Sequence, residues 1–226
     1  MPNEEKELSK IRGTLAYMAT VMKGMFERSY RAIASHDEDL ARQVIQDDSI
    51  ADNLETELEE LALRHLALYA PKAQELRYVV AVLRLATDME RVSDHATAMA
   101  RQVFSSHLSP FVASFPTFGQ MVDLSSGLLT AATDSLFKLE DTTYKRIQQE
   151  LKTIKEFKNN LEQQLVQSLS KDPELSQPIV SFLNVIRRVD RVAGHARNIA
   201  VMVPYITQGT LYRHKTESEQ DADTLD

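Results

Sequence analysis

The chain contains no cysteine and no tryptophan among its 226 residues. Without cysteine it forms no disulfide and no thiolate metal site, which leaves carboxylates and the six histidines as strong side-chain ligands. Six glycines and seven prolines are too few for the many turns of a β-sandwich or β-barrel. This shortage of turn residues favours long helices.

Long apolar runs are also missing. No stretch approaches the roughly 18 apolar residues of a membrane-spanning helix, and residues 1–10 are polar and acidic, unlike a secretory signal. We therefore expect a cytoplasmic protein. The net charge of −7, from 26 basic and 33 acidic residues, disfavours general binding of nucleic acid or of anionic lipid.

Apolar residues recur at alternating steps of three and four along most of the chain, the spacing of the core stripe of a bundle helix. We interpret Met18, Met22 and Met25 as core residues of the first such stripe. A comparable pattern in the third segment predicts that its apolar residues Leu76, Val79, Val80, Leu83 and Ala86 point inward. The pattern predicts six helices, over residues 5–35, 38–69, 74–104, 117–138, 141–169 and 173–205.

Polar residues mark several of the predicted helix starts. Ser35 and Glu38 have the spacing of a capping box, in which each side chain satisfies a free backbone N–H of the new helix. Asp141 is placed to cap the fifth helix. Asp172 followed by Pro173 predicts the N-cap and first turn of the sixth helix.

The third and sixth predicted helices share a sequence pattern. Arg91-Val92 and His95-Ala96 recur 100 positions later, within residues 183–200. Internal duplication explains this match. The sequence therefore predicts an all-α fold of two tandem three-helix bundles, with a first repeat over residues 1–108, a linker over 109–116, a second repeat over 117–212 and a disordered tail over 213–226.

Two pairs of carboxylates stand out in the first half. Asp48 and Asp52 are four residues apart on the second predicted helix, and Glu90 and Asp94 are four apart on the third. This spacing places both members of a pair on one helix face, where like charges repel. A cation removes the repulsion, and oxygen ligands on neighbouring helices suit Mg, Mn, Fe or, less well, Zn.

A solvated acidic surface explains the same carboxylates, because Lys72, Arg84 and Arg91 are available to neutralise them. A di-iron oxidase or ferritin-like metal protein is a further alternative, but the Glu-x-x-His ligand motif occurs at none of the six histidines. We interpret the recurring His95 and His195 as residues that make contacts between helices. No phosphate-binding loop or nucleophile elbow is present, and we expect no enzymatic activity.

These motifs resemble the PhoU family. The resemblance rests on residues 71–77, on residues 86–96, which run from Ala-Thr-Asp-Met-Glu to Asp-His-Ala, and on the acidic residues 48–55. It extends over nearly the whole chain, including the duplicated three-helix layout.

The resemblance implies a cytoplasmic regulator of phosphate uptake that forms a homodimer. Its partners would be the ATPase subunit of a phosphate transporter and a sensor histidine kinase, through which it would reach the membrane and restrain the phosphate-starvation response. It also implies a divalent or trivalent metal ion (Fe, Mn, Mg or Zn) at the acidic motifs of the first repeat. An accessory protein of another phosphate or metal-ion transporter is the alternative.

The second half departs from this pattern. Gly194 stands where the first half has Asp94, and Arg188 stands in place of Asp88. We therefore expect metal in the first repeat only. In the second repeat, a charge pair between Lys155 and Asp190 is predicted to take its place.

Overall fold

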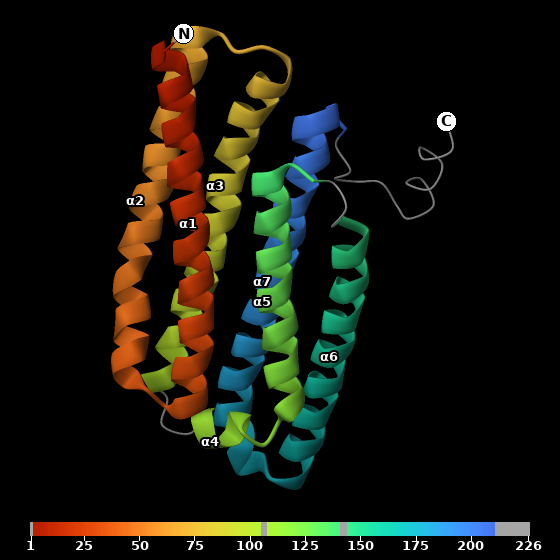
Figure 1. Ribbon diagram of the computed structural model, residues 1–226. Helices are drawn as coiled ribbons and strands as arrows, with labels where there is room; N and C mark the ends of the chain where they lie inside the picture. Colours follow the sequence, from red (N-terminus) through yellow and green to blue (C-terminus); the bar gives the residue numbers. More distant parts are fainter. Residues whose placement is uncertain (1, 105–107, 141–143, 211–226) are drawn as a thin grey trace, which may run out of the picture.

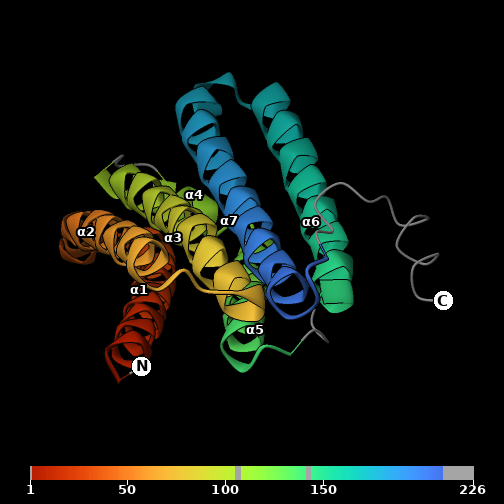
Figure 2. The same ribbon diagram turned by 90° about the horizontal axis from the view of Figure 1, so that it is seen from above.

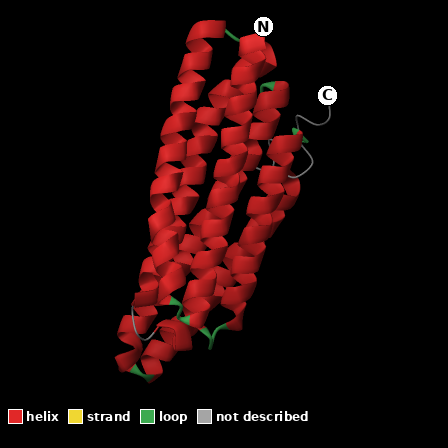
Figure 3. Cartoon of the chain, turned by 60° about the vertical axis from the view of Figure 1, so that its left-hand side comes forward, coloured by secondary structure: helices red, strands yellow, loops and turns green. Residues whose placement is uncertain are grey.

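The computed structural model describes residues 2–104, 108–140 and 144–210. Over these ranges the chain is helical without a strand, and six long helices dominate it (Figure 1). Figure 3, coloured by secondary structure, shows the same elongated bundle with short connecting loops. The all-α prediction is confirmed. The helices are α1 (Pro2–Ser35), α2 (Glu38–Tyr69), α3 (Ala73–Ala100), α4 (Leu108–Val112), α5 (Pro116–Lys138), α6 (Tyr144–Lys171) and α7 (Ser176–Gln208).

The long helices form two three-helix bundles that share one core. Helices α1, α2 and α3 pack on one another, as do α5, α6 and α7, and α3 lies against α7 where the bundles meet. Seen from above in Figure 2, the order across the molecule is α2, α3, α7 and α6, with α1 and α5 on one side of this row. The α2/α3 and α6/α7 pairs therefore occupy matching positions in the two repeats.

The core is built from the predicted apolar stripes. Met18, Met22 and Met25 have no exposed surface, as expected for core residues. In the second bundle the rings of Phe118 and Phe182 meet edge to face, with their centroids 5.0 Å apart. Most of the driving force for folding comes from burial of this apolar surface, which stabilises by about 25 cal/mol per Å².

Leu76 was predicted to point inward, but 41% of it is exposed. The reason is the rotation of α3 about its axis. Leu76 lies on the same line as Leu83, which is only partly buried, and this line follows the edge of the α2/α3 contact instead of the core. Val79 and Ala86, which were also predicted to point inward, are buried as expected, and Val82 on the same face fills the core with them.

Two of the predicted helix starts differ from the structure. The side chain of Asp37, at the N-cap of α2, accepts a hydrogen bond from the backbone N–H of Leu40. Ser35 is instead the last residue of α1, and its hydroxyl donates to a carbonyl of that helix, so the Ser35–Glu38 capping box is wrong. Asp172 caps the 3₁₀ turn Pro173–Leu175, and α7 begins after this turn.

The segment between the repeats contains the short helix α4, which packs against α1 and α7. The predicted cap Asp141 and the predicted tail, residues 213–226, lie outside the described residues. Within the described ranges, no helix has the length and apolar character needed to cross a membrane.

Candidate functional site

The four carboxylates singled out in the sequence lie along one edge of the contact between α2 and α3, which we call the acidic groove. Asp48 and Asp52 come from α2, and Glu90 and Asp94 come from α3. Because the two helices are joined by a short loop and run in opposite directions, their i, i+4 pairs face each other. Glu55, one turn further along α2, raises the pKa of Glu90 by its negative charge and so belongs to the same groove.

Two threonines on α3 fix how the two helices meet. The Thr97 hydroxyl donates a 3.0 Å hydrogen bond to Oδ1 of Asp48, and the Thr87 hydroxyl donates a 2.9 Å bond to Oε1 of Glu55. Neither threonine was predicted from the sequence. Their only signal was their position, one turn before Glu90 and one turn after Asp94 on the same helix face.

The acidic groove disfavours the ionised form of two of its carboxylates, Asp48 and Glu90. Burial and the neighbouring Asp94 raise the pKa of Glu90 to about 7, against the opposing effect of Arg91. Burial also raises the pKa of Asp48, and the charges of Asp52 and Asp94 act in the same direction, whereas the Thr97 hydrogen bond opposes them. Near neutral pH the groove therefore holds a proton that a cation would displace.

Arg91 is the cation nearest to the α3 carboxylates. It lies 3.0 Å from Oδ2 of Asp94 and 3.5 Å from Oε2 of Glu90. The Arg91 side chain is 56% exposed, whereas Glu90 is only 13% exposed. A surface pair of this kind contributes about 0–1 kcal/mol, so Arg91 only partly offsets the repulsion in the groove.

The donor set of the acidic groove suits a hard metal ion, because all its ligands are carboxylate oxygens. In the described residues, however, no three side chains of histidine, aspartate or glutamate converge closely enough to hold a metal. Asp48 and Glu55 are turned toward threonine hydroxyls, and Asp94 toward Arg91. Metal binding would therefore require carboxylates to exchange these partners for the ion.

The second repeat carries a charge pair at the matching place, but its lysine is not the predicted one. The ammonium of Lys158 lies 2.8 Å from Oδ2 of Asp190. Lys155, the predicted partner, is exposed on α6. Lys158 follows the buried Ile154 by one turn, on the side of α6 that faces α7, whereas Lys155 is rotated about 100° away from Ile154.

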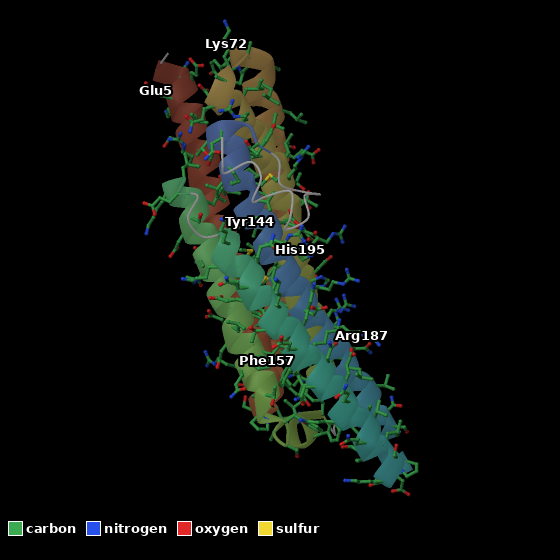
Figure 4. The ribbon with its side chains drawn as sticks, turned by 90° about the vertical axis from the view of Figure 1, so that its right-hand side faces the viewer. Glu5, Lys72, Tyr144, Phe157, Arg187 and His195 are labelled. Atoms are coloured by element: carbon green, nitrogen blue, oxygen red, sulfur yellow. The ribbon has the colours of Figure 1, made fainter. Side chains whose placement is uncertain are left out.

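A polar seam joins α3 to α7 at the centre of the molecule. The carboxylate of Asp88 accepts hydrogen bonds from Asn198, at 2.9 Å, and from Nδ1 of His195, at 2.8 Å. Arg188 lies 3.2 Å from Nδ1 of His95. Figure 4 shows His195 on the edge of α7 that faces away from α5.

The two histidines of the seam lie close together, with ring centroids 5.5 Å apart. Burial lowers the pKa of His95 to about 4, and the neighbouring His195 and Arg188 act in the same direction. His95 is therefore neutral at pH 7 and accepts a hydrogen bond from Arg188. The expectation that both histidines make contacts between helices is confirmed.

A family model described as the PhoU domain matches the chain twice, over residues 15–103 and 118–203. The chain belongs to the PhoU family. The two matches coincide with the two three-helix bundles, so the internal duplication inferred from the sequence is a repeat of the PhoU domain.

Curated relatives carry names related to phosphate transport. A "phosphate-specific transport system accessory protein PhoU homolog" of Pseudomonas putida is 28% identical over 92% of this chain and 82% of its own length. The "phosphate-specific transport system accessory protein PhoU" of Escherichia coli K12 is 24% identical, over 95% of this chain and 89% of its own.

Solved PhoU structures have the same fold. PhoU from Pseudomonas aeruginosa superposes with a TM-score of 0.83 over 91% of this chain and 99% of its own, at 23% identity. The "phosphate transport system regulatory protein PhoU" from Streptococcus pneumoniae gives a TM-score of 0.84 over 93% and 100%, at 22% identity.

Proposed function

We propose that this protein is a cytoplasmic adaptor of phosphate signalling. It restrains the phosphate-starvation response through contacts with the ATPase subunit of a phosphate transporter and with a sensor histidine kinase. It acts as a homodimer without catalysis of its own. The observation that carries this proposal is the double match to the PhoU domain, supported by relatives named as accessory proteins of phosphate transport.

The acidic groove is the metal site in this proposal. Asp48, Asp52, Glu90 and Asp94 would hold a divalent or trivalent ion of Fe, Mn, Mg or Zn, with Glu55 beside them. The support is electrostatic: burial and mutual repulsion raise the pKa values of Asp48 and Glu90, so a cation at this place removes a cost that the protein otherwise bears. The bound metal would supply positive charge that joins α2 to α3 and has a structural or sensory role.

Deletion of the gene tests the signalling role. In phosphate-rich medium, the deletion strain should express phosphate-starvation genes that the parent strain keeps silent. The phenotype should be reversed by the unaltered gene carried on a plasmid. Unchanged expression in the deletion strain would contradict the proposal and favour an accessory protein of another transporter.

Matched variants test the role of the acidic groove. Glu90→Gln with Asp94→Asn keeps the shape of both side chains and removes two metal-binding charges. Glu60→Gln with Asp39→Asn removes the same number of charges at exposed positions of α2, away from the groove. We expect the first gene to fail in complementation and the second to succeed. Equal complementation by both would rule out a signalling role for the groove.

A further inference from the structure

The two helix pairs that occupy matching positions in the repeats carry opposite charge. Helix α2 has nine acidic and two basic residues, whereas α6 has three acidic and six basic residues. Helix α3 has four acidic and three basic residues, and α7 has one acidic and four basic residues. The acidic α2/α3 pair of the first repeat therefore has a basic counterpart, α6/α7, in the second.

The Lys158–Asp190 pair fixes the correspondence between the two grooves. In the first repeat Glu55 faces Glu90, and in the second Lys158 faces Asp190. Helix α7 thus follows α3 at an offset of 100 positions, and α6 follows α2 at an offset of 103. The remaining substitutions at matching positions follow from these offsets: Lys155 replaces Asp52, Arg187 replaces Thr87, Gly194 replaces Asp94 and Arg197 replaces Thr97.

The replacement of Asp94 by Gly194 removes a hydrogen-bond acceptor but keeps the arginine that donates to it. In the first repeat Arg91 donates to Oδ2 of Asp94. In the second repeat Arg191 is retained, but Gly194 has no carboxylate to receive its hydrogen bonds. Arg191 makes no hydrogen bond or ion pair within the described part of the chain. A Cβ atom added to Gly194 would meet nothing within 4 Å, so the space of the missing carboxylate is open.

A second arginine of α7 has a buried nitrogen without an acceptor. The Nε atom of Arg197 is buried, and no hydrogen-bond acceptor reaches it among the described residues. Arg197 lies one turn from Gly194, as Thr97 does from Asp94, and Thr97 faces α2 in the first repeat. A buried donor without an acceptor is unfavourable, and an incoming anion would supply the missing acceptor.

Asp190, an acidic residue close to Gly194 on α7, does not repel an anion at this place. Asp190, one turn before Gly194, is neutralised by Lys158 at 2.8 Å. Lys155 adds a further exposed ammonium on α6 at the position of Asp52. Lys155 and Arg197 thus stand at the positions that match Asp52 and Thr97 of the acidic groove, and Arg191 lies one turn before the position that matches Asp94.

We propose that this groove, formed by Lys155, Arg191, Gly194 and Arg197, binds inorganic phosphate. Guanidinium groups bind the oxygens of a phosphate in a bidentate manner, and the carboxylate that is missing at Gly194 leaves Arg191 free to bind the ion. The choice of phosphate among tetrahedral oxyanions rests on the proposed function in phosphate signalling. The two repeats then respond to ligands of opposite charge, a metal ion in the first and phosphate in the second.

Restoring the missing carboxylate tests the site. Isothermal titration calorimetry of the full chain with inorganic phosphate, at fixed ionic strength in chloride, measures binding. Gly194→Asp supplies Arg191 with an internal acceptor and should weaken phosphate binding at least about tenfold, equivalent to about 1.4 kcal/mol. Gly194→Ala adds a Cβ without charge and should change the affinity less than about threefold, because the Cβ meets no neighbour.

The matched control is Gly13→Asp, which makes the same chemical change at an open position of α1. It should leave phosphate affinity unchanged, whereas Arg191→Gln and Arg197→Gln should each weaken it. The proposal is overturned if unaltered protein binds no phosphate, if Gly194→Asp binds as the unaltered protein does, or if Gly13→Asp weakens binding equally. Circular dichroism establishes that each variant keeps its helices.

Two further measurements separate this site from related possibilities. Phenyl phosphate is a phosphate ester and mimics a phosphorylated partner. If phenyl phosphate binds more tightly than inorganic phosphate, the groove is assigned to a phosphorylated partner and the proposal is overturned. In cells, the unaltered gene and the Gly194→Asp gene are compared for repression of phosphate-starvation genes. Equal repression by the two genes would contradict signalling through this groove and leave the proposed adaptor function intact.

Discussion

The Nδ1 atom of His195, on α7, lies 2.8 Å from Oδ1 of Asp88, on α3, and this contact joins the two PhoU repeats. The counterpart of this contact across the internal repeat joins Arg188 to His95. At the offset of 100 positions, Arg188 stands in place of Asp88, and His95 matches His195. In one contact a carboxylate accepts from an imidazole, and in the other an imidazole accepts from a guanidinium. Exchange of Asp88 for Arg188 has therefore reversed the direction of the hydrogen bond.

Asp88→Ala tests how much this seam contributes to stability. The substitution leaves both His195 and Asn198 without their acceptor at partly buried positions. We expect the free energy of unfolding to fall by about 1–3 kcal/mol. Asp39→Ala is the control, since Asp39 pairs with Arg42 at an exposed position and its loss should cost at most about 1 kcal/mol. Urea denaturation measures both; equal losses would mean that the seam contributes no more than a surface pair.

The raised pKa of Glu90 predicts a pH-dependent cost. Below the ordinary glutamate pKa of 4.5, Glu90 is protonated in both the folded and unfolded states. Between pH 4.5 and about 7 the folded protein keeps a proton that the unfolded chain releases, so this residue makes stability fall as pH rises. Glu90→Gln should remove that fall and stabilise the metal-free protein at pH 8 by about 1 kcal/mol, after allowance for solvent screening.

The comparison must be made against the unaltered protein at each pH. The lowered pKa of His95 acts in the opposite sense, raising stability as pH rises from about 4 to 6.5, and it partly hides the effect of Glu90. The difference between the two unfolding curves, recorded in urea with a chelator present, isolates Glu90 to first order. A difference that stays constant from pH 4.5 to 8 would show that the pKa of Glu90 is not raised.

The parts of the fold that depend on local pattern were predictable from the sequence. The buried methionines of α1 and the duplicated helices follow from spacing along a single helix. The lysine that pairs with Asp190 was misplaced by three residues, because the rotation of α6 against α7 is set by packing between helices. Thr87 and Thr97 were missed for the same reason: nothing within α3 shows which carboxylate of α2 each hydroxyl meets.

Lys158→Ala tests which lysine neutralises Asp190. Because the side chains of Lys158 and Asp190 are 26% and 23% exposed, the loss of the pair should cost about 1–2 kcal/mol, between the values for surface and buried ion pairs. Lys155→Ala, on the exposed side of α6, should change the free energy of unfolding by less than about 0.5 kcal/mol. If the two variants lose equal stability, the Lys158–Asp190 pair is not a specific contact.

The last prediction concerns the difference between the repeats in metal dependence. Asp52→Ala with Glu90→Ala removes one carboxylate from each side of the acidic groove and should abolish most metal binding, whereas Asp190→Ala should leave the metal content unchanged. Binding should also weaken below about pH 7, because Glu90 must lose its proton before it serves as a ligand.

Elemental analysis of protein purified after equilibration with each metal measures the content. Phosphate is omitted from the buffer, so that an anion in the second groove does not carry a metal ion with it. If Asp190→Ala reduces the metal content as much as the double substitution does, the second repeat contributes to the metal site. The assignment of opposite charge preferences to the two grooves would then be wrong.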